Sequence, residues 1–433
     1  MKSIFAWLAA AAALALSFPA HAERRKVALR EALQLAAKQG PDVAAARAQA
    51  QIAEASVQRA WTTWQPDLSA TGTFDHTSAP ASIPAGALGL GSPPVTIVAE
   101  NSKYATFQIS QPLLTPQGLF LPGIANATAE AAARGSDEAR EQVLLGVARA
   151  YLGLQGLEGL LAAARDAEKV ALRREDDAKA QIAAGTAVEI ALLRAQTETA
   201  GARAQISSLE GQRDSLLPLL EALTGEAIEP LAAGPGEDLG KPSQESAEPW
   251  EQTYSVKSAK AFAVAANRAT TLDHFLWMPS VAGIARENYS SNAGFANKNW
   301  TYDLILNVSV PIYDRGTRYA QLHEDQARLA QAQAQLASSR AKARANWLGA
   351  VANLSAAQAV LQQSDTQAQL ATKAQAQVSA SYRAGVATSL DLSDADQKRF
   401  AAASAAAQAR AALEIRKAEV AAAEGRLYEV AAR

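Results

Sequence analysis

The chain has 433 residues, a net charge of −2 and no cysteine, and 49% of its residues are hydrophobic. The near-neutral charge gives no basic surface for nucleic acid. The lack of cysteine excludes disulfides, thiolate metal ligands and a lipidated N-terminal cysteine. Alanine, the best helix former but a small core residue, supplies much of the hydrophobic fraction, so the composition predicts long helices that pack closely.

The N-terminus, residues 1–22, has the pattern of a signal peptide. An apolar run over residues 4–18 follows Lys2, and an Ala-His-Ala cleavage pattern ends at Ala22. The run is short for a membrane span, and an uncleaved anchor is the alternative. We expect export and a mature chain that begins at Glu23, which suits a Gram-negative cell envelope.

Helix and then two strands are predicted at the start of the mature chain. A helical segment covers 27–60, with a break at Gly40-Pro41. One strand is expected after Pro66 and one before Pro112, because apolar and polar residues alternate there over about ten residues. A tilted strand of that length crosses a bilayer. A Pro- and Gly-rich loop at 77–102 separates the two strands.

Two long helices complete the first half. Segments at about 120–184 and 187–224 are expected to run out to Gly185 and back, with a kink at Pro218. At 1.5 Å per residue, a helix of about seventy residues is about 100 Å long. Residues 226–249 are rich in proline, glycine and acidic residues, which predicts a linker.

The second half of the chain repeats this order, with three matching positions at offsets of 213, 199 and 200 residues. These matches are Trp64 with Trp277, Pro112 with Pro311, and Gly185 with Gly385. The number of residues from the proline to the glycine is nearly the same in both halves. This is expected for helices of fixed length joined by loops that tolerate insertions. The predicted domains are therefore the signal peptide, a first repeat at 23–225, the linker at 226–249 and a second repeat at 250–433.

The second repeat contains the same predicted elements. A strand with a less regular pattern follows Pro279, and a clear strand covers 300–310. The loop between these two strands, at 290–299, is shorter than its counterpart in the first repeat. Long helices are expected over about 315–384 and 388–430.

Four strands of this length in one chain cannot close a membrane barrel. Bacterial barrels begin at eight strands, and an open sheet edge in lipid leaves backbone groups unpaired at a cost of several kcal/mol each. Two chains would give eight strands around an interior filled by side chains, and three would give twelve strands around a lumen. The pattern predicts an oligomeric tube with a short β-barrel and a helical section in the periplasm.

Two stretches of sequence, taken together with the internal repeat, form a pattern specific enough to compare with known families. They are LREALQLAAKQGPDVAAARAQ at 29–49 and YRAGVATSLDLSDADQ at 382–397. Together with the prolines that bound the strands, they resemble the TolC-type outer-membrane efflux protein family over essentially the whole mature chain. The resemblance implies a mainly α-helical homotrimer, with four strands per chain in a 12-stranded membrane β-barrel and a long α-helical barrel. It implies an outer-membrane exit duct for efflux or type I secretion, with porin activity.

The partners implied by the resemblance are two further copies of the chain, outer-membrane lipid, a periplasmic adaptor and an inner-membrane pump of the RND, ABC or MFS class. Gly185 and Gly385 would lie in the helix-turn-helix tips at the periplasmic entrance, where a glycine accepts the positive φ that ends a helix. Tyr382 matches a tyrosine of the family beside the second tip, where the adaptor would make contact.

Family members carry acidic residues after the second tip that ring the entrance constriction, and here they correspond to Asp391 and Asp394. Their i, i+3 spacing places both on one helix face. Six carboxylates from three chains would favour cations. The alternative for Asp391 is a helix cap, because Thr388 and Asp391 resemble a capping box. Asp396 is expected to be an ordinary solvated residue.

The sequence also departs from the family at the tips. The arginine and the acid that help to lock the closed state in the family correspond to Ala387 and Ala191. We therefore expect another contact to hold the entrance closed, with Arg383, Glu189 or Arg194 as candidates.

Catalysis has little support in the sequence, and no cofactor or metal site is predicted. The histidines are scattered, HEDQA at 323–327 lacks the second histidine of a zincin helix, and GALGLG at 86–91 has the wrong spacing for a dinucleotide loop. The alternative to a channel is an elongated periplasmic coiled-coil adaptor or structural protein. Adaptors carry one helical hairpin, whereas this chain has two and strands of membrane length.

Overall fold

The computed structural model describes residues 24–86, 89, 91, 94–186, 188–231, 248–293 and 298–432. The predicted signal peptide and most of the predicted linker lie outside these residues. The chain divides into two units, one with the described residues up to 48, 135–256 and 339–433, the other with 49–134 and 257–338. Each unit takes segments from both sequence repeats, so the repeat boundaries stay a prediction.

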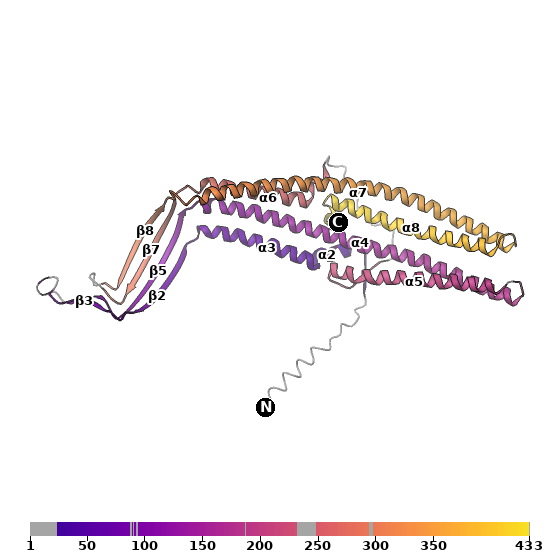
Figure 1. Ribbon diagram of the computed structural model, residues 1–433, viewed down its shortest axis with the longest axis horizontal. Helices are drawn as coiled ribbons and strands as arrows, with labels where there is room; N and C mark the ends of the chain where they lie inside the picture. The colour runs from indigo at the N-terminus through magenta and orange to yellow at the C-terminus, as the bar shows by residue number, and fades with distance from the viewer. Residues whose placement is uncertain are drawn as a thin grey trace, which may run out of the picture. The chain divides into compact units, whose positions relative to one another are not determined.

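Helices make up most of the described chain, and Figure 1 labels them in order. The α-helices are α2 (Leu29–Gln39), α3 (Pro41–Trp61), α4 (Pro116–Ala183), α5 (Glu189–Thr224), α6 (Tyr254–Phe275), α7 (Thr317–Arg383), α8 (Ser389–Ala423) and α9 (Leu427–Ala432). The strands are β1 (Arg25–Val27), β2 (Asp67–His76), β3 (Ala81–Ile83), β4 (Val95–Val98), β5 (Asn101–Leu114), β6 (Ile228–Pro230), β7 (Ser280–Ser290) and β8 (Trp300–Ser309). None of the helices in the described residues combines the length and the apolar character of a membrane span.

The second unit contains a four-stranded antiparallel sheet in the order β2-β5-β7-β8 (Figure 1). The two predicted strand pairs are confirmed, and the seam between them is β5 against β7, where Ile109 lies opposite Ala285. The less regular strand after Pro279 is a continuous strand of 11 residues, because it has a partner on each side. The predicted loop at 77–102 differs from the expectation, since it contains the short antiparallel pair β3 and β4.

The outer strands of this sheet are exposed along their whole length. All ten residues of β2 and all ten of β8 are exposed. Several of the exposed side chains are large and apolar, with Leu304 at 77%, Leu306 at 67% and Leu68 at 67% exposure. Contiguous apolar surface of this kind is rare on a free surface and marks contact with lipid or another chain.

The first unit holds the hairpin of α4, from residue 135, with α5 and the hairpin of α7, from residue 339, with α8, and the two hairpins run side by side in Figure 1. The predicted long helices are confirmed, because α4 has 68 residues and α7 has 67. Pro218 lies inside α5 without ending it. Alanine dominates these helices, and small side chains allow neighbouring helices to approach closely.

The start of the mature chain differs from the prediction. The helix expected from residue 27 begins at Leu29, because residues 25–27 form β1 and pair in parallel with β6. The predicted break is confirmed, since α2 ends at Gln39 and α3 begins at Pro41. A Cβ on Gly40 would lie 2.5 Å from the Ala36 carbonyl oxygen, so only glycine fits this turn.

The main hydrophobic core of the first unit gathers around α4. Tyr151 is fully buried, and its hydroxyl donates a hydrogen bond of 2.8 Å to the Val27 carbonyl of β1. Leu144, Leu220 and Leu427 belong to the same core and bring α4, α5 and α9 together. This core depends on contacts between distant segments, which local sequence patterns do not specify.

Candidate functional site: the helical turns and their cross-links

The two predicted turn glycines have the same geometry. Gly185 has φ +73° and Gly385 has φ +76°, in the left-handed region that ends helices. In both turns the glycine N–H binds the carbonyl three residues back, and the next N–H binds the carbonyl five residues back. A Cβ at either glycine would meet nothing within 4 Å, so the positive φ, not crowding, requires glycine.

Asp391 caps the N-terminus of α8. Its amide donates to the Thr388 hydroxyl (3.2 Å), and its carboxylate accepts from the Thr388 amide (2.8 Å), which is a complete capping box. The hydrogen bonds from the Thr388 hydroxyl and amide hold the pKa of Asp391 below its usual value. The expected capping role is therefore present, and the side chain is also exposed.

Asp394 is exposed at 58% and forms an ion pair of 2.7 Å with Lys398 on the same helix. The two predicted entrance residues thus differ, because the carboxylate of Asp391 is held by a neutral cap and that of Asp394 by a cation. An exposed i, i+4 pair is worth only about 0.3–0.5 kcal/mol and can separate readily.

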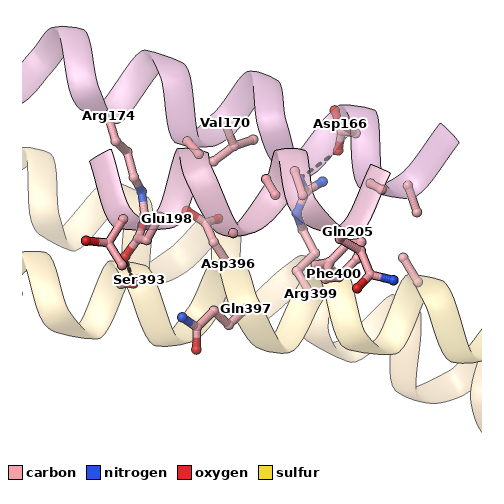
Figure 2. Close-up of a pocket in the computed structure, with 18 residues that line it drawn as sticks. Asp166, Val170, Arg174, Glu198, Gln205, Ser393, Asp396, Gln397, Arg399 and Phe400 are labelled. Atoms are coloured by element: carbon pink, nitrogen blue, oxygen red, sulfur yellow. Dashed lines mark hydrogen bonds and ion pairs between the residues drawn. The ribbon is translucent and has the colours of Figure 1, made fainter. Parts of the chain in front are cut away.

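Asp396 was expected to be solvated, and this expectation is wrong. Its side chain is 12% exposed and pairs with Arg174 of α4, whose side chain is 16% exposed. Arg174 also contacts Glu198 of α5 at 2.8 Å, and the Ser393 hydroxyl of α8 donates to Glu198. Three helices from both hairpins therefore meet in one charged network, which Figure 2 shows at one end of a cavity.

The cavity lies between α4, α5 and α8 and has a volume of about 430 Å³. Alanines from the three helices and Gly201 form much of its wall, so the space results from small side chains where helices meet. At the other end Arg399 of α8 pairs with Asp166 of α4 at 2.8 Å (Figure 2). The two hairpins are thus linked at both ends of the cavity, and a further ion pair of 2.7 Å between Arg149 of α4 and Glu419 of α8 joins them outside it.

Tyr382 provides another link between the hairpins, close to the turns. Its hydroxyl accepts a hydrogen bond of 3.2 Å from the Gln181 side chain of α4. The residues expected to replace the missing lock behave differently. Arg383 donates to the Ser379 carbonyl of its own helix, and Glu189 and Arg194 form no ion pair with any described residue. Arg174, Arg399 and Arg149 make the cross-hairpin ion pairs instead, and that of Arg174 is the one with both side chains mostly buried.

The fold is that of outer-membrane channels. The solved structures similar to this chain include VceC from Vibrio cholerae (18% identity, TM-score 0.75, 92% of this chain and 96% of that chain covered). CusC has 16% identity, a TM-score of 0.79 and 95% coverage of both chains. The open state of MtrE from Neisseria gonorrhoeae has 20% identity, a TM-score of 0.76 and coverage of 92% and 88%. At these identities the likeness establishes the fold.

Sequence comparison establishes the family. The model of the outer membrane efflux protein family matches residues 32–226 and 251–426, so the chain belongs to this family. A comparison with curated proteins found no significant match. The protein is an efflux channel of the outer membrane, and its family and its structural neighbours are channel proteins. The alternative of a periplasmic adaptor is not supported.

Proposed function

We propose that three copies of this chain form the exit duct of a tripartite efflux or type I secretion system, with a periplasmic adaptor and an inner-membrane pump. The open four-stranded sheet is the observation that carries this proposal. Among the described strands, β2 pairs only with β5 and β8 only with β7, so each sheet has two open edges. Joining β8 of one copy to β2 of the next satisfies both edges, and three copies give a barrel of twelve strands with a lumen.

The absence of cysteine makes this arrangement testable by cross-linking. One cysteine would be placed on β2 at Thr71 and one on β8, at a series of positions from Thr301 to Asn307. We expect oxidation in the outer membrane to give covalent dimers and trimers, and no larger species, for the positions that lie opposite Thr71. Products that end at dimers at every position would refute the twelve-stranded barrel.

The turns at Gly185 and Gly385 are the proposed contact with the adaptor. Apolar side chains beside both turns are exposed, Val188 at 70% and Ile190 at 54% after the first, Val386 at 83% and Leu390 at 67% after the second. Exposed apolar groups at the end of a polar helical hairpin favour a protein partner. Tyr382 lies beside the second turn, and its hydrogen bond to the Gln181 side chain holds that turn against α4.

Asp391 and Asp394 are the proposed constriction of the periplasmic entrance. Their positions in the first two turns of α8 place two carboxylates per chain near the second turn. The cap at Asp391 fixes the start of α8, and Asp394 lies 2.7 Å from Lys398 one turn further along the helix. Three chains would bring six carboxylates together, and a ring of carboxylates in a narrow passage attracts cations.

A further inference from the structure

A pair of acidic side chains lies in the second unit, on the helices next to the second strand pair. Asp273 is two residues from the end of α6, and Asp325 is in the third turn of α7. Because α6 leads into β7 and α7 follows β8, these helices form the stem of the second strand pair. Both residues are buried, with 4% exposure for Asp273 and 7% for Asp325.

The two carboxyl groups differ in their partners. In the described residues, no N–H or O–H donor reaches either oxygen of the Asp273 carboxylate. Asp325 pairs with Arg328 at 3.0 Å, and Arg328 is shared with Glu324. An ionised carboxylate that is buried with no donor costs several kcal/mol, so such a group takes up a proton instead.

The surroundings of Asp273 favour its protonated form. Burial raises the pKa of Asp273 most, and the carboxyl group of Asp325, through its charge and through a side-chain hydrogen bond between the two groups, raises it further, from 3.8 to about 6; His274 has a smaller opposite effect. No group of three metal-ligating side chains occurs among the described residues, so the site has too few ligands for a metal ion. A proton is therefore the cation that fits between the two carboxyl groups.

The first repeat offers an internal comparison. With the offset of 213 residues between Trp64 and Trp277, Asp273 corresponds to Ala60. With the offset of 199 residues between the prolines, Asp325 corresponds to Asn126. Ala60 is buried at 9% exposure, so an alanine fills the equivalent position in a stem of the same kind. The packing of the helices beside a strand pair therefore does not by itself require two carboxyl groups at these positions.

We propose that Asp273 and Asp325 share one proton and fasten α6 to α7, so that the stem of the second strand pair is tighter in acid than at neutral pH. In the protonated pair, one carboxyl O–H donates a hydrogen bond to the other carboxylate. Loss of that proton to solvent leaves two negative charges facing each other in a buried site, which pushes the helices apart. The inference requires neither the trimer nor the partner proteins.

The sign of the pH dependence follows from the direction of the shift. The pKa of Asp273 in the folded chain lies above its ordinary value, so folding binds this proton more tightly. The stabilising contribution is complete below about pH 4 and is lost as the pH rises through about 6. Loosening should be confined to the end of α6 and the start of α7.

Amide hydrogen exchange of the purified full-length protein in detergent tests the proposal, by comparing the wild type with Asp273→Asn at the same pH. The asparagine amide donates to Asp325 at every pH and mimics the protonated pair. At pH 5 we expect equal exchange in the two proteins. At pH 8 we expect residues 265–275 and 317–330 to exchange on the order of tenfold faster in the wild type.

Two further variants complete the test. Glu324→Gln is the matched control, because Glu324 also contacts Arg328 but its side chain is 60% exposed, and it should exchange like the wild type. Asp325→Asn replaces Asp273→Asn if the latter does not assemble, and it should also abolish the difference between the two pH values. Equal exchange of wild type and Asp273→Asn at pH 8 would overturn the proposal.

Discussion

Arg174 of α4 and Asp396 of α8 form an ion pair that joins the two helical hairpins of one chain. The pair is mostly buried, and Glu198 of α5 shares the same guanidinium. Within each hairpin the helices are already connected by a turn, so the pair resists only the separation of one hairpin from the other. An entrance formed by the hairpin tips would open by that separation.

Replacing Arg174 with alanine should therefore favour the open entrance. Removing one partner of a buried ion pair costs about 3–5 kcal/mol, because Asp396 and Glu198 remain as uncompensated charges. We expect a clear rise in single-channel conductance in planar bilayers and a greater sensitivity of the cells to large antibiotics. Assembly should be unchanged, since the sheet is far from Arg174 in the sequence and belongs to the other unit.

Arg203→Ala is the matched control for this prediction. Arg203 pairs with Glu168 at 2.9 Å, but that pair joins α4 to α5 within one hairpin, and its arginine side chain is 62% exposed. We expect this variant to conduct like the wild type. If Arg174→Ala also conducts like the wild type, the ion pair does not hold the entrance closed.

The cap and the proposed charge ring at Asp391 can be separated by mutation. Asp391→Asn combined with Asp394→Asn removes the charges, so cation preference and block by multivalent cations from the periplasmic side should fall strongly. Thr388→Ala removes the cap hydroxyl at a cost of about 1 kcal/mol but leaves both carboxylates in place. Reversal potentials in asymmetric salt measure the selectivity of each variant.

The comparison of the two variants decides between the roles. If the carboxylates form the constriction, the double asparagine variant loses selectivity and Thr388→Ala keeps it. Equal loss in both would show that the start of α8 matters, not the charge. Wild-type selectivity and block in the double variant would place the constriction elsewhere.

Much of the fold was predictable because the features that define its strands and turns involve residues close together in the sequence. Period-two alternation predicted β2, β5 and β8, and the glycine and proline positions predicted the break at Gly40 and both helical turns. The pairing of β1 with β6 was not predictable, since three-residue strands far apart in the sequence carry no periodic signal.

The cross-hairpin network was missed for a similar reason. Composition alone favours solvated surface for a charged residue on a long helix, and it predicts an exposed Asp396. A positional signal existed, because Arg174 lies 11 residues before Gly185 and Asp396 lies 11 residues after Gly385. When two hairpins lie side by side with their turns at the same end, residues at equal separations from the turns lie next to each other. However, the side-by-side packing of the two hairpins depends on tertiary contacts, which the spacing of residues in the sequence does not specify.

The loops at 77–102 and 290–299 are predicted to face the cell exterior. They join the strand pairs at the ends away from the helices, and surface loops tolerate insertions. An epitope tag at Gly89 should be detected by antibody on intact cells. A tag in the predicted linker at 226–249 is the control, and it should become accessible only after the outer membrane is ruptured. The reverse result would mean an inverted topology.

The C-terminal helix α9 is fixed by a buried acid. The Glu141 carboxylate of α4 accepts hydrogen bonds from the amides of Leu427 (3.2 Å) and Tyr428 (2.9 Å) at the start of α9. Beside it, the Arg140 guanidinium lies 3.9 Å from the centre of the Tyr428 ring. Burial raises the pKa of Glu141 to about 7, although the two backbone hydrogen bonds act in the opposite direction.

This pKa predicts that α9 is held more firmly in mild acid than at alkaline pH. The folded-state pKa lies above the ordinary value of 4.5, so the contribution of Glu141 is complete below about pH 4.5 and is lost as the pH rises through about 7. Glu141→Gln keeps a carbonyl acceptor for the two amides but cannot ionise. Its thermal midpoint should match that of the wild type near pH 5 and exceed it at pH 8.5. Glu138→Gln is the nearby control: Glu138 accepts a hydrogen bond from the Ser255 amide, and its charge has the smallest of the effects on the pKa of Glu141, so this variant should keep the pH trend and weaken it only slightly. If the thermal midpoints of wild type and Glu141→Gln change with pH in the same way across this range, the ionisation of Glu141 does not loosen α9 and the prediction is wrong.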